Sequence, residues 1–264
     1  MSSPADVLAH LLASDPGRPR VTQYDDTDGP ARGERVELSA RALANWVAKA
    51  ASLLVEEHDA GPGTRVRLAL PPHWRLAYWA LATWSVGGCV DLDLDLDLDL
   101  DPDLDVALDP GRDPGRRGAG PADVVVSDDP VRLAAAASGP GSPATVLVTL
   151  PALARAAAGP VPPGAVDEAR ELAAYPDVLP VVEEPAGTDP ALATAAGTTA
   201  YLDVVPHGRP AGTRLHTSAT DPAAFLGLAL GAWAADGSVV LSRGPVEEAV
   251  LAARLRAEGV TAGA

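Results

Sequence analysis

The spacing of apolar residues between Glu37 and Val90 predicts a helix, a strand, a second helix and a further strand. The apolar positions of the first helix recur at a spacing typical of one buried helical face, and they are Leu38, Leu43, Trp46, Val47, Leu53 and Leu54. Ser39 stands where its side chain can cap the first turn. A Gly-Pro-Gly sequence ends this helix, an apolar run at 66–70 predicts the strand, and 75–85 predicts the second helix.

The same alternation continues along the rest of the chain. Short apolar or β-branched runs predict strands at 124–126, 145–148 and 238–241. Helices are predicted near the N-terminus and at 131–137, 150–158, 167–174, 222–234 and 246–258. A Pro-rich stretch at 176–190 predicts an excursion over the surface. Because strands that alternate with helices favour βα units, we expect a single α/β domain over residues 1–264, built on a doubly wound, mainly parallel sheet.

The composition is typical of a folded cytoplasmic protein. Hydrophobic residues make up 47% of the 264 residues, which is enough for a substantial core. A single cysteine, Cys89, excludes an intramolecular disulfide and a cysteine-based zinc site, and it favours a reducing compartment. The sequence shows neither a basic signal-peptide start nor an apolar run of about 18 residues, so we expect a soluble protein in the cytoplasm.

The net charge of −16 argues against nucleic acid and membrane as partners, because phosphate contacts need clustered Lys and Arg. Much of the charge lies in an insert at 91–120: Asp91–Asp109 holds nine acidic residues and no basic ones, which leaves −7 (−16 + 9) for the rest. The alternating Asp residues suggest a calcium-binding EF-hand loop, but that loop needs Gly and Glu where this run has Leu96 and Pro102. We therefore interpret the insert as an acidic low-complexity expansion in which only Asp91–Asp93 continues the preceding strand.

A series of segments resembles, in order, the N-terminal part of the adenylate-forming superfamily, which includes acyl-CoA synthetases, peptide-synthetase adenylation domains and luciferases. The segments are ELSARALANWVAKAASLL, GPGTRV with RLALPPHWRLAYWALATWSVGG, DVVVSDD, DPALATAAGTT, PAGTRLHTSATDPAAFLGLALGAWAADGSVVL and RLRAEGVT. The resemblance implies an AMP-binding-like α/β fold. It also implies that the motifs for Mg²⁺ and ribose, and the mobile C-terminal domain of the family, would lie beyond Ala264.

The resemblance places a remnant of the family's phosphate-binding loop at Gly197, Thr198 and Thr199. In the family this loop has the form [ST]-S-G-T-T-G-x-P-K-G, in which small residues let backbone amides approach the phosphates and Lys adds charge. Asp203 stands here in the place of that Lys, which reverses the sign of the local field. The only lysine of the chain is Lys49, which the periodicity places on the first helix.

Other catalytic arrangements are poorly matched. His216, Ser218 and Asp221 are close in sequence, but no strained G-x-S-x-G turn presents a nucleophile. The five histidines lack the spacing of a zinc site, and no G-x-G-x-x-G sequence follows a strand. The tryptophans of the second predicted helix favour core packing or a subunit contact over a ligand cage, and they are Trp74, Trp79 and Trp84.

Two functions follow as hypotheses. The first is a non-catalytic homologue of adenylate-forming enzymes, without catalytic residues, a metal site or a cofactor, which binds a small carboxylic acid, a nucleotide or a protein partner. The second is an AMP-forming acid–thiol ligase that uses ATP and Mg²⁺ and is completed by another chain. The single lysine favours the first, because phosphoryl chemistry depends on positioned cations.

Overall fold

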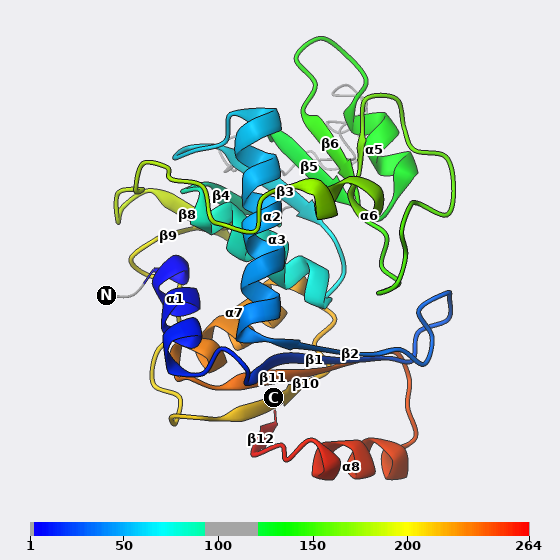
Figure 1. The fold of residues 1–264 in the computed structure, drawn as a ribbon, viewed down its shortest axis with the longest axis vertical. Helices are drawn as coiled ribbons and strands as arrows, with labels where there is room; N and C mark the ends of the chain where they lie inside the picture. Colours follow the sequence, from blue (N-terminus) through cyan, green and yellow to red (C-terminus); the bar gives the residue numbers. More distant parts are fainter. Residues whose placement is uncertain (1–2, 93–120, 264) are drawn as a thin grey trace, which may run out of the picture.

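The computed structural model describes residues 3–92 and 121–263, and two β-sheets organise the fold (Figure 1). The seven-stranded sheet has the order β7-β6-β5-β3-β4-β8-β9, and the five-stranded sheet has the order β12-β10-β11-β1-β2. The strands of the larger sheet are β3 (Arg65–Ala69), β4 (Cys89–Asp91), β5 (Val124–Ser127), β6 (Ala144–Leu147), β7 (Val166–Asp167), β8 (Pro190–Thr194) and β9 (Gly197–Ala200). Those of the smaller sheet are β1 (Pro19–Asp25), β2 (Arg35–Ser39), β10 (Arg214–Thr217), β11 (Ser238–Arg243) and β12 (Ala262–Gly263).

Parallel pairing dominates both sheets. Among the described strands, the only antiparallel pairs are β1–β2 and β8–β9, and each lies at a sheet edge. The prediction of a mainly parallel α/β fold is therefore confirmed, with the strands divided between two sheets.

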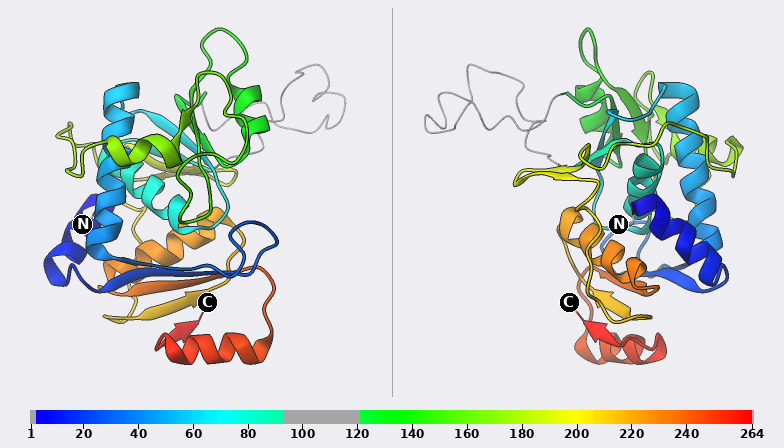
Figure 2. Two further views of the ribbon diagram at one scale, coloured as in Figure 1. Left: turned by 45° about the vertical axis from the view of Figure 1, so that its right-hand side comes forward. Right: turned by 90° about the vertical axis from the view of Figure 1, so that its left-hand side faces the viewer.

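Helices fill the space between the sheets and cover the outer face of the smaller one. They are α1 (Pro4–Ser14), α2 (Ala40–His58), α3 (Trp74–Ser85), α5 (Pro130–Ala136), α6 (Glu168–Glu171), α7 (Pro222–Ala234) and α8 (Glu248–Ala257), with a 3-10 turn η3 (Leu172–Ala174). In Figure 2, α7 lies on one face of the five-stranded sheet and α8 lies on the other. No helix of the described ranges, 3–92 and 121–263, has both the length and the apolar character needed to cross a bilayer.

Helix α3 is the centre of the core, because every residue from Trp74 to Trp84 is buried. Trp79 and Trp84 are within 2% of complete burial, which confirms the prediction of core packing for the tryptophans. Trp84 also donates its indole Nε1–H to the carbonyl oxygen of Ala191 at 2.7 Å and so links α3 to β8. Helix α3 follows a parallel strand, and residues of both sheets pack against it, so it joins the two sheets into one core.

The helix boundaries follow from capping. The hydroxyl of Ser39 accepts a hydrogen bond from the amide of Ala42 at 3.2 Å, and this confirms Ser39 as the N-cap of α2. Helix α7 spans Pro222–Ala234, as the apolar pattern predicts, and its first turn is capped by Asp221, which accepts from the amide of Ala224 at 2.7 Å.

Three sequence-based predictions need correction or completion. Residues 150–158 form turns and not a helix, because the segment has no apolar face to bury, and Leu153 is 90% exposed. Leu38 belongs to β2 and not to α2. The acidic insert lies almost entirely outside the described residues. Asp91 continues the strand as predicted, but β4 ends there and Leu92 lies outside it. The carboxylate of Asp91 is fully buried, 3.0 Å from the guanidinium groups of Arg65 and Arg67.

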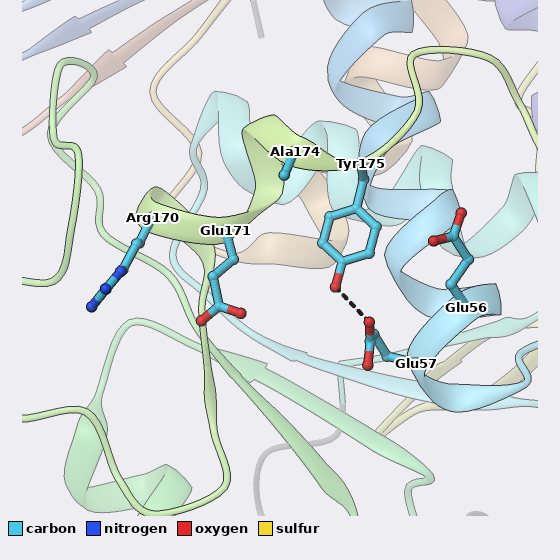
Figure 3. A pocket seen from close by; sticks show the side chains of 6 residues that line it. All are labelled: Glu56, Glu57, Arg170, Glu171, Ala174 and Tyr175. Atoms are coloured by element: carbon cyan, nitrogen blue, oxygen red, sulfur yellow. Dashed lines mark hydrogen bonds between the residues drawn. The ribbon is translucent and has the colours of Figure 1, made fainter.

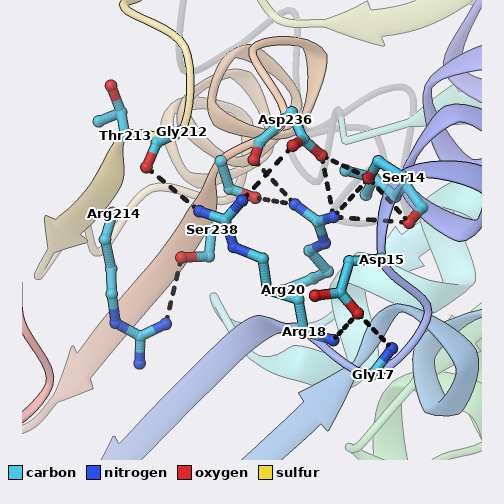
Figure 4. Close-up of polar contacts among 12 residues, drawn as sticks. Ser14, Asp15, Gly17, Arg18, Arg20, Gly212, Thr213, Arg214, Asp236 and Ser238 are labelled. Atoms are coloured by element: carbon cyan, nitrogen blue, oxygen red, sulfur yellow. Dashed lines mark hydrogen bonds and ion pairs between the residues drawn. The ribbon is translucent and has the colours of Figure 1, made fainter.

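A buried arginine joins α1, β1 and the turn after α7 (Figure 4). The guanidinium of Arg20 is fully buried and donates to the carbonyl oxygens of Asp236 and Gly237 at 2.8 and 3.1 Å. It also donates to the hydroxyl of Ser14 at 2.8 Å and pairs with the carboxylate of Asp236 at 2.9 Å. Gly237 must be glycine, since a Cβ atom there would lie 2.2 Å from the carbonyl oxygen of Thr213.

Candidate functional site

The three residues predicted to bind phosphate lie together in β9, the edge strand of the seven-stranded sheet. Gly197 pairs with Thr194, Thr198 with Ala193 and Thr199 with Leu192. A turn at 195–196 closes this β8–β9 hairpin. Gly197 and Thr198 are exposed, whereas Thr199 is half-buried.

This hairpin differs from a phosphate-binding loop in its backbone geometry. A phosphate cradle needs several consecutive amides that converge on one point, whereas a strand directs successive amides to opposite sides. A Cβ atom added to Gly197 would meet nothing within 4 Å, so the backbone there does not approach another group closely. Tyr201 follows the hairpin and fixes its end, because its hydroxyl donates to the carbonyl oxygen of Gly88 at 2.7 Å. Phosphate binding by Gly197, Thr198 and Thr199 stays a prediction.

The single lysine contacts a different part of the molecule. Lys49 lies on α2, as predicted, and its Nζ donates to the carbonyl oxygens of Ala173 and Tyr175 at 2.8 and 2.6 Å. These carbonyls belong to the end of η3, where a positive charge is favourable. Lys49 is therefore used to attach η3 to α2.

His216, Ser218 and Asp221 do not form a catalytic triad. The Nε2 atom of His216 lies 3.1 Å from the hydroxyl of Ser242, while the carboxylate of Asp221 caps α7. Burial lowers the pKa of His216 below its usual value, which keeps the ring neutral near pH 7. The arrangement is a polar contact between β10 and β11.

A buried polar cluster lies at the start of α3, and the hydropathy pattern of the sequence does not predict it. Gln23 accepts a hydrogen bond from the amide of Trp74 at 2.9 Å, and Nδ1 of His73 accepts from the amide of Arg75 at 3.2 Å. Burial, with the nearby charges of Arg243 and Arg75, holds the pKa of His73 well below its usual range. The proline pair before His73 was the only signal in the sequence, because it marks the point where the chain turns into α3.

The same cluster contains a buried ion pair. The guanidinium of Arg75 lies 2.7 Å from the carboxylate of Glu168, which also accepts a hydrogen bond from the hydroxyl of Tyr78. Burial raises the pKa of Glu168 and holds the pKa of Tyr78 well above its usual range, so the phenol stays a donor at neutral pH. The pair connects α6 to α3 and is a structural contact.

A shallow hollow of about 360 Å³ lies between α2 and the α6–η3 segment (Figure 3). Its lining residues are Glu56, Glu57, Arg170, Glu171, Ala174 and Tyr175. The hydroxyl of Tyr175 donates to Glu57 at 2.9 Å. Burial, together with Glu57, raises the pKa of Tyr175 to about 12. Three carboxylates against one guanidinium make the hollow unsuited to phosphate and suited to a cation.

Comparison with known proteins identifies the fold. No family model matches the chain. A TIGR03089 family protein of Mycobacterium tuberculosis is 47% identical over 87 residues, which are 33% of this chain and 34% of that protein. The chain therefore spans about a third of the length of this curated relative.

Solved structures match nearly the whole chain. An acyl-CoA synthetase of Brucella canis matches 99% of the chain and 47% of its own length, with a TM-score of 0.69 and 16% identity. The N-terminal domain of FACL13 from Mycobacterium tuberculosis matches 100% of this chain and 62% of its own length, with a TM-score of 0.67 and 14% identity. A putative long-chain-fatty-acid CoA ligase of Rhodopseudomonas palustris matches 99% of this chain and 62% of its own length, with a TM-score of 0.68 and 19% identity.

These likenesses define a class of fold. The chain has a mixed α/β fold like that of the N-terminal domains of acyl-CoA synthetases, which confirms the fold that the sequence resemblance implies. The chain spans about half to three fifths of the length of these solved proteins.

Proposed function

We propose that this chain is a non-catalytic homologue of adenylate-forming enzymes and that it acts by binding. The observation that carries the proposal is the position of Lys49. The side chain of this only lysine donates to two carbonyl oxygens at the end of η3, so these 264 residues offer no lysine to the predicted phosphate loop.

The charge near the predicted loop supports the same proposal. Asp203 follows β9 and stands where the family has its phosphate-binding Lys. Replacing an attractive charge with a repulsive one opposes both triphosphate binding and the stabilisation of phosphoryl transfer.

The alternative is an AMP-forming ligase that is completed by another chain and uses ATP and Mg²⁺. It is supported by the names of the solved neighbours, which include acyl-CoA synthetases, and by the partial length over which they match. In that case Gly197, Thr198 and Thr199 would contact the phosphates, and the remaining cations would come from the partner.

Exchange of pyrophosphate into ATP, measured with a panel of carboxylic acids, separates the two functions. The proposal predicts no exchange above background. Exchange that is lost in the double variant T198A/T199A and kept in T188A, an exposed threonine outside the hairpin, would overturn it.

Thermal unfolding with and without ATP and Mg²⁺ tests nucleotide binding separately. A ligand present at 100 times its Kd stabilises a protein by about 2.7 kcal/mol, which gives a measurable shift of the midpoint. A shift of the midpoint without pyrophosphate exchange would support a role in nucleotide binding. If the midpoint does not shift, the binding partner would be a protein or a carboxylic acid and not a nucleotide.

A further inference from the structure

The acidic hollow between α2 and α6–η3 is followed in the chain by a mostly exposed segment, residues 176–185, which we name the strap. The strap begins directly after Tyr175, whose side chain points toward Glu57 across the hollow in Figure 3. Val178 is three residues further on, so it lies within about 11 Å of Tyr175. The strap therefore starts at the edge of the hollow.

The charge of the hollow and the strap is negative. The hollow has three carboxylates and one guanidinium, a net charge of −2 (−3 + 1). Among the described residues, none forms an ion pair with its three glutamates, and Figure 3 shows Arg170 pointing away from Glu56 and Glu57. The strap adds Asp177, Glu183 and Glu184 and contains no basic residue.

The strap also exposes apolar side chains. Seven large apolar residues of the described chain are exposed, and three of them lie in the strap within four positions. Val178 is 71% exposed, Leu179 is 41% exposed and Val181 is fully exposed. Scattered exposed valines are ordinary, but a group beside a hollow is typical of a contact surface for another protein.

The backbone of the strap is available for hydrogen bonding. Within the described residues, no amide of the strap donates to a backbone carbonyl, and the strap has neither helix nor strand. Three prolines, at 176, 180 and 185, keep it extended. An extended segment with unpaired amides and carbonyls can pair with a strand from another chain.

We propose that the hollow and the strap form a docking surface for a basic, aliphatic segment of a partner protein, bound in an extended conformation. An Arg or Lys side chain enters the hollow beside Glu56 and Glu57, and aliphatic side chains cover Val178 and Val181. Charge complementarity selects this partner over an acidic peptide or an anionic membrane, which the surface would repel. The inference goes beyond the proposed function, because docking can be measured whether or not the chain exchanges pyrophosphate.

A fluorescent peptide of alternating Arg and Leu residues tests the proposal with the full-length chain. We expect binding that weakens with added salt, and no binding of the same peptide with Glu in place of Arg. The variant E56Q/E57Q should weaken binding about tenfold or more. The amide oxygen that E57Q introduces can still accept the hydrogen bond of Tyr175, so this variant is expected to fold. The variant V178S/V181S should also weaken binding while leaving the charge of the surface unchanged, because it removes only apolar side chains.

The control must separate this surface from the general acidity of the chain. The variant E247Q/E248Q removes the same charge from exposed positions at the start of α8 and should leave the affinity unchanged. A photo-crosslinking group on the peptide should label the strap or η3. Equal weakening by both Glu pairs, cross-links confined to the acidic run at 93–109, or no binding of the basic peptide would each overturn the proposal.

Discussion

The surroundings of Arg20 and the β8–β9 hairpin show opposite uses of polar residues. Arg20 is fully buried and links its own strand β1 to two other elements, α1 and the turn after α7, through a carboxylate, a hydroxyl and two carbonyl oxygens. The hairpin, where the family resemblance predicts phosphate chemistry, presents Gly197 and Thr198 to solvent without a nearby lysine. The buried guanidinium of Arg20 therefore stabilises a junction between elements, whereas the hairpin has no lysine beside it.

The strongest way to test this contrast is to remove the buried guanidinium. We expect R20M to lower the free energy of unfolding by about 3 kcal/mol or more, because it leaves buried carbonyl oxygens without a donor. Arg18 contacts the same Asp236 at 3.4 Å, but its side chain is 34% exposed, so R18M should cost less than about 1 kcal/mol. Chemical denaturation of both variants measures the difference. Equal losses would show that the burial of Arg20 is unimportant.

The fold and the candidate site were predictable to different extents. Helices α2 and α7 were predicted because their apolar residues follow helical spacing or fill the whole helix. Strand β1 was missed because it holds Arg20 and Gln23, which a hydropathy pattern assigns to the surface. Their partners, Asp236 and the amide of Trp74, are distant in sequence, so only the tertiary structure explains why these polar residues are buried.

The structure of the candidate site also depends on contacts that are distant in sequence. The motif located Gly197, Thr198 and Thr199 in the chain, but pairing with β8 gives their backbone its extended form. The sequence predicts that Asp91 continues a strand, but it does not reveal that the carboxylate is buried between Arg65 and Arg67, which belong to the neighbouring strand β3. The sequence contained no local signal for the hollow, since Glu56 and Tyr175 meet only after α2 and η3 pack together.

The pH dependence of stability tests the Arg20 cluster by a second route. Burial opposes ionisation of Asp236, but hydrogen bonds from Ser14 and Arg20 outweigh it and lower the pKa of this carboxyl. A lowered pKa in the folded state means that the stabilisation is fully present above the unfolded value of about 3.9 and is lost as the pH falls through the folded value. The difference in stability between the wild type and D236N should therefore be constant above about pH 5 and shrink below about pH 4.

Asp28 provides the control for this measurement. Its carboxylate pairs with Arg32 but is 95% exposed, so the difference between the wild type and D28N should stay small at every pH. A difference for D236N that does not change on acidification would show that the carboxylate charge contributes nothing to the cluster.

The smallest expected effect is at the hairpin itself. T198A/T199A should change the free energy of unfolding by no more than about 0.5 kcal/mol for each residue, because both threonines lie on an edge strand and neither is buried. W84F, which removes the hydrogen bond from the indole to Ala191 of the neighbouring β8, should cost about 1–3 kcal/mol and serves as the contrast. If the double threonine variant were as destabilising as W84F, the hairpin would be a tightly packed part of the scaffold, and its threonines would need a structural explanation in place of a functional one.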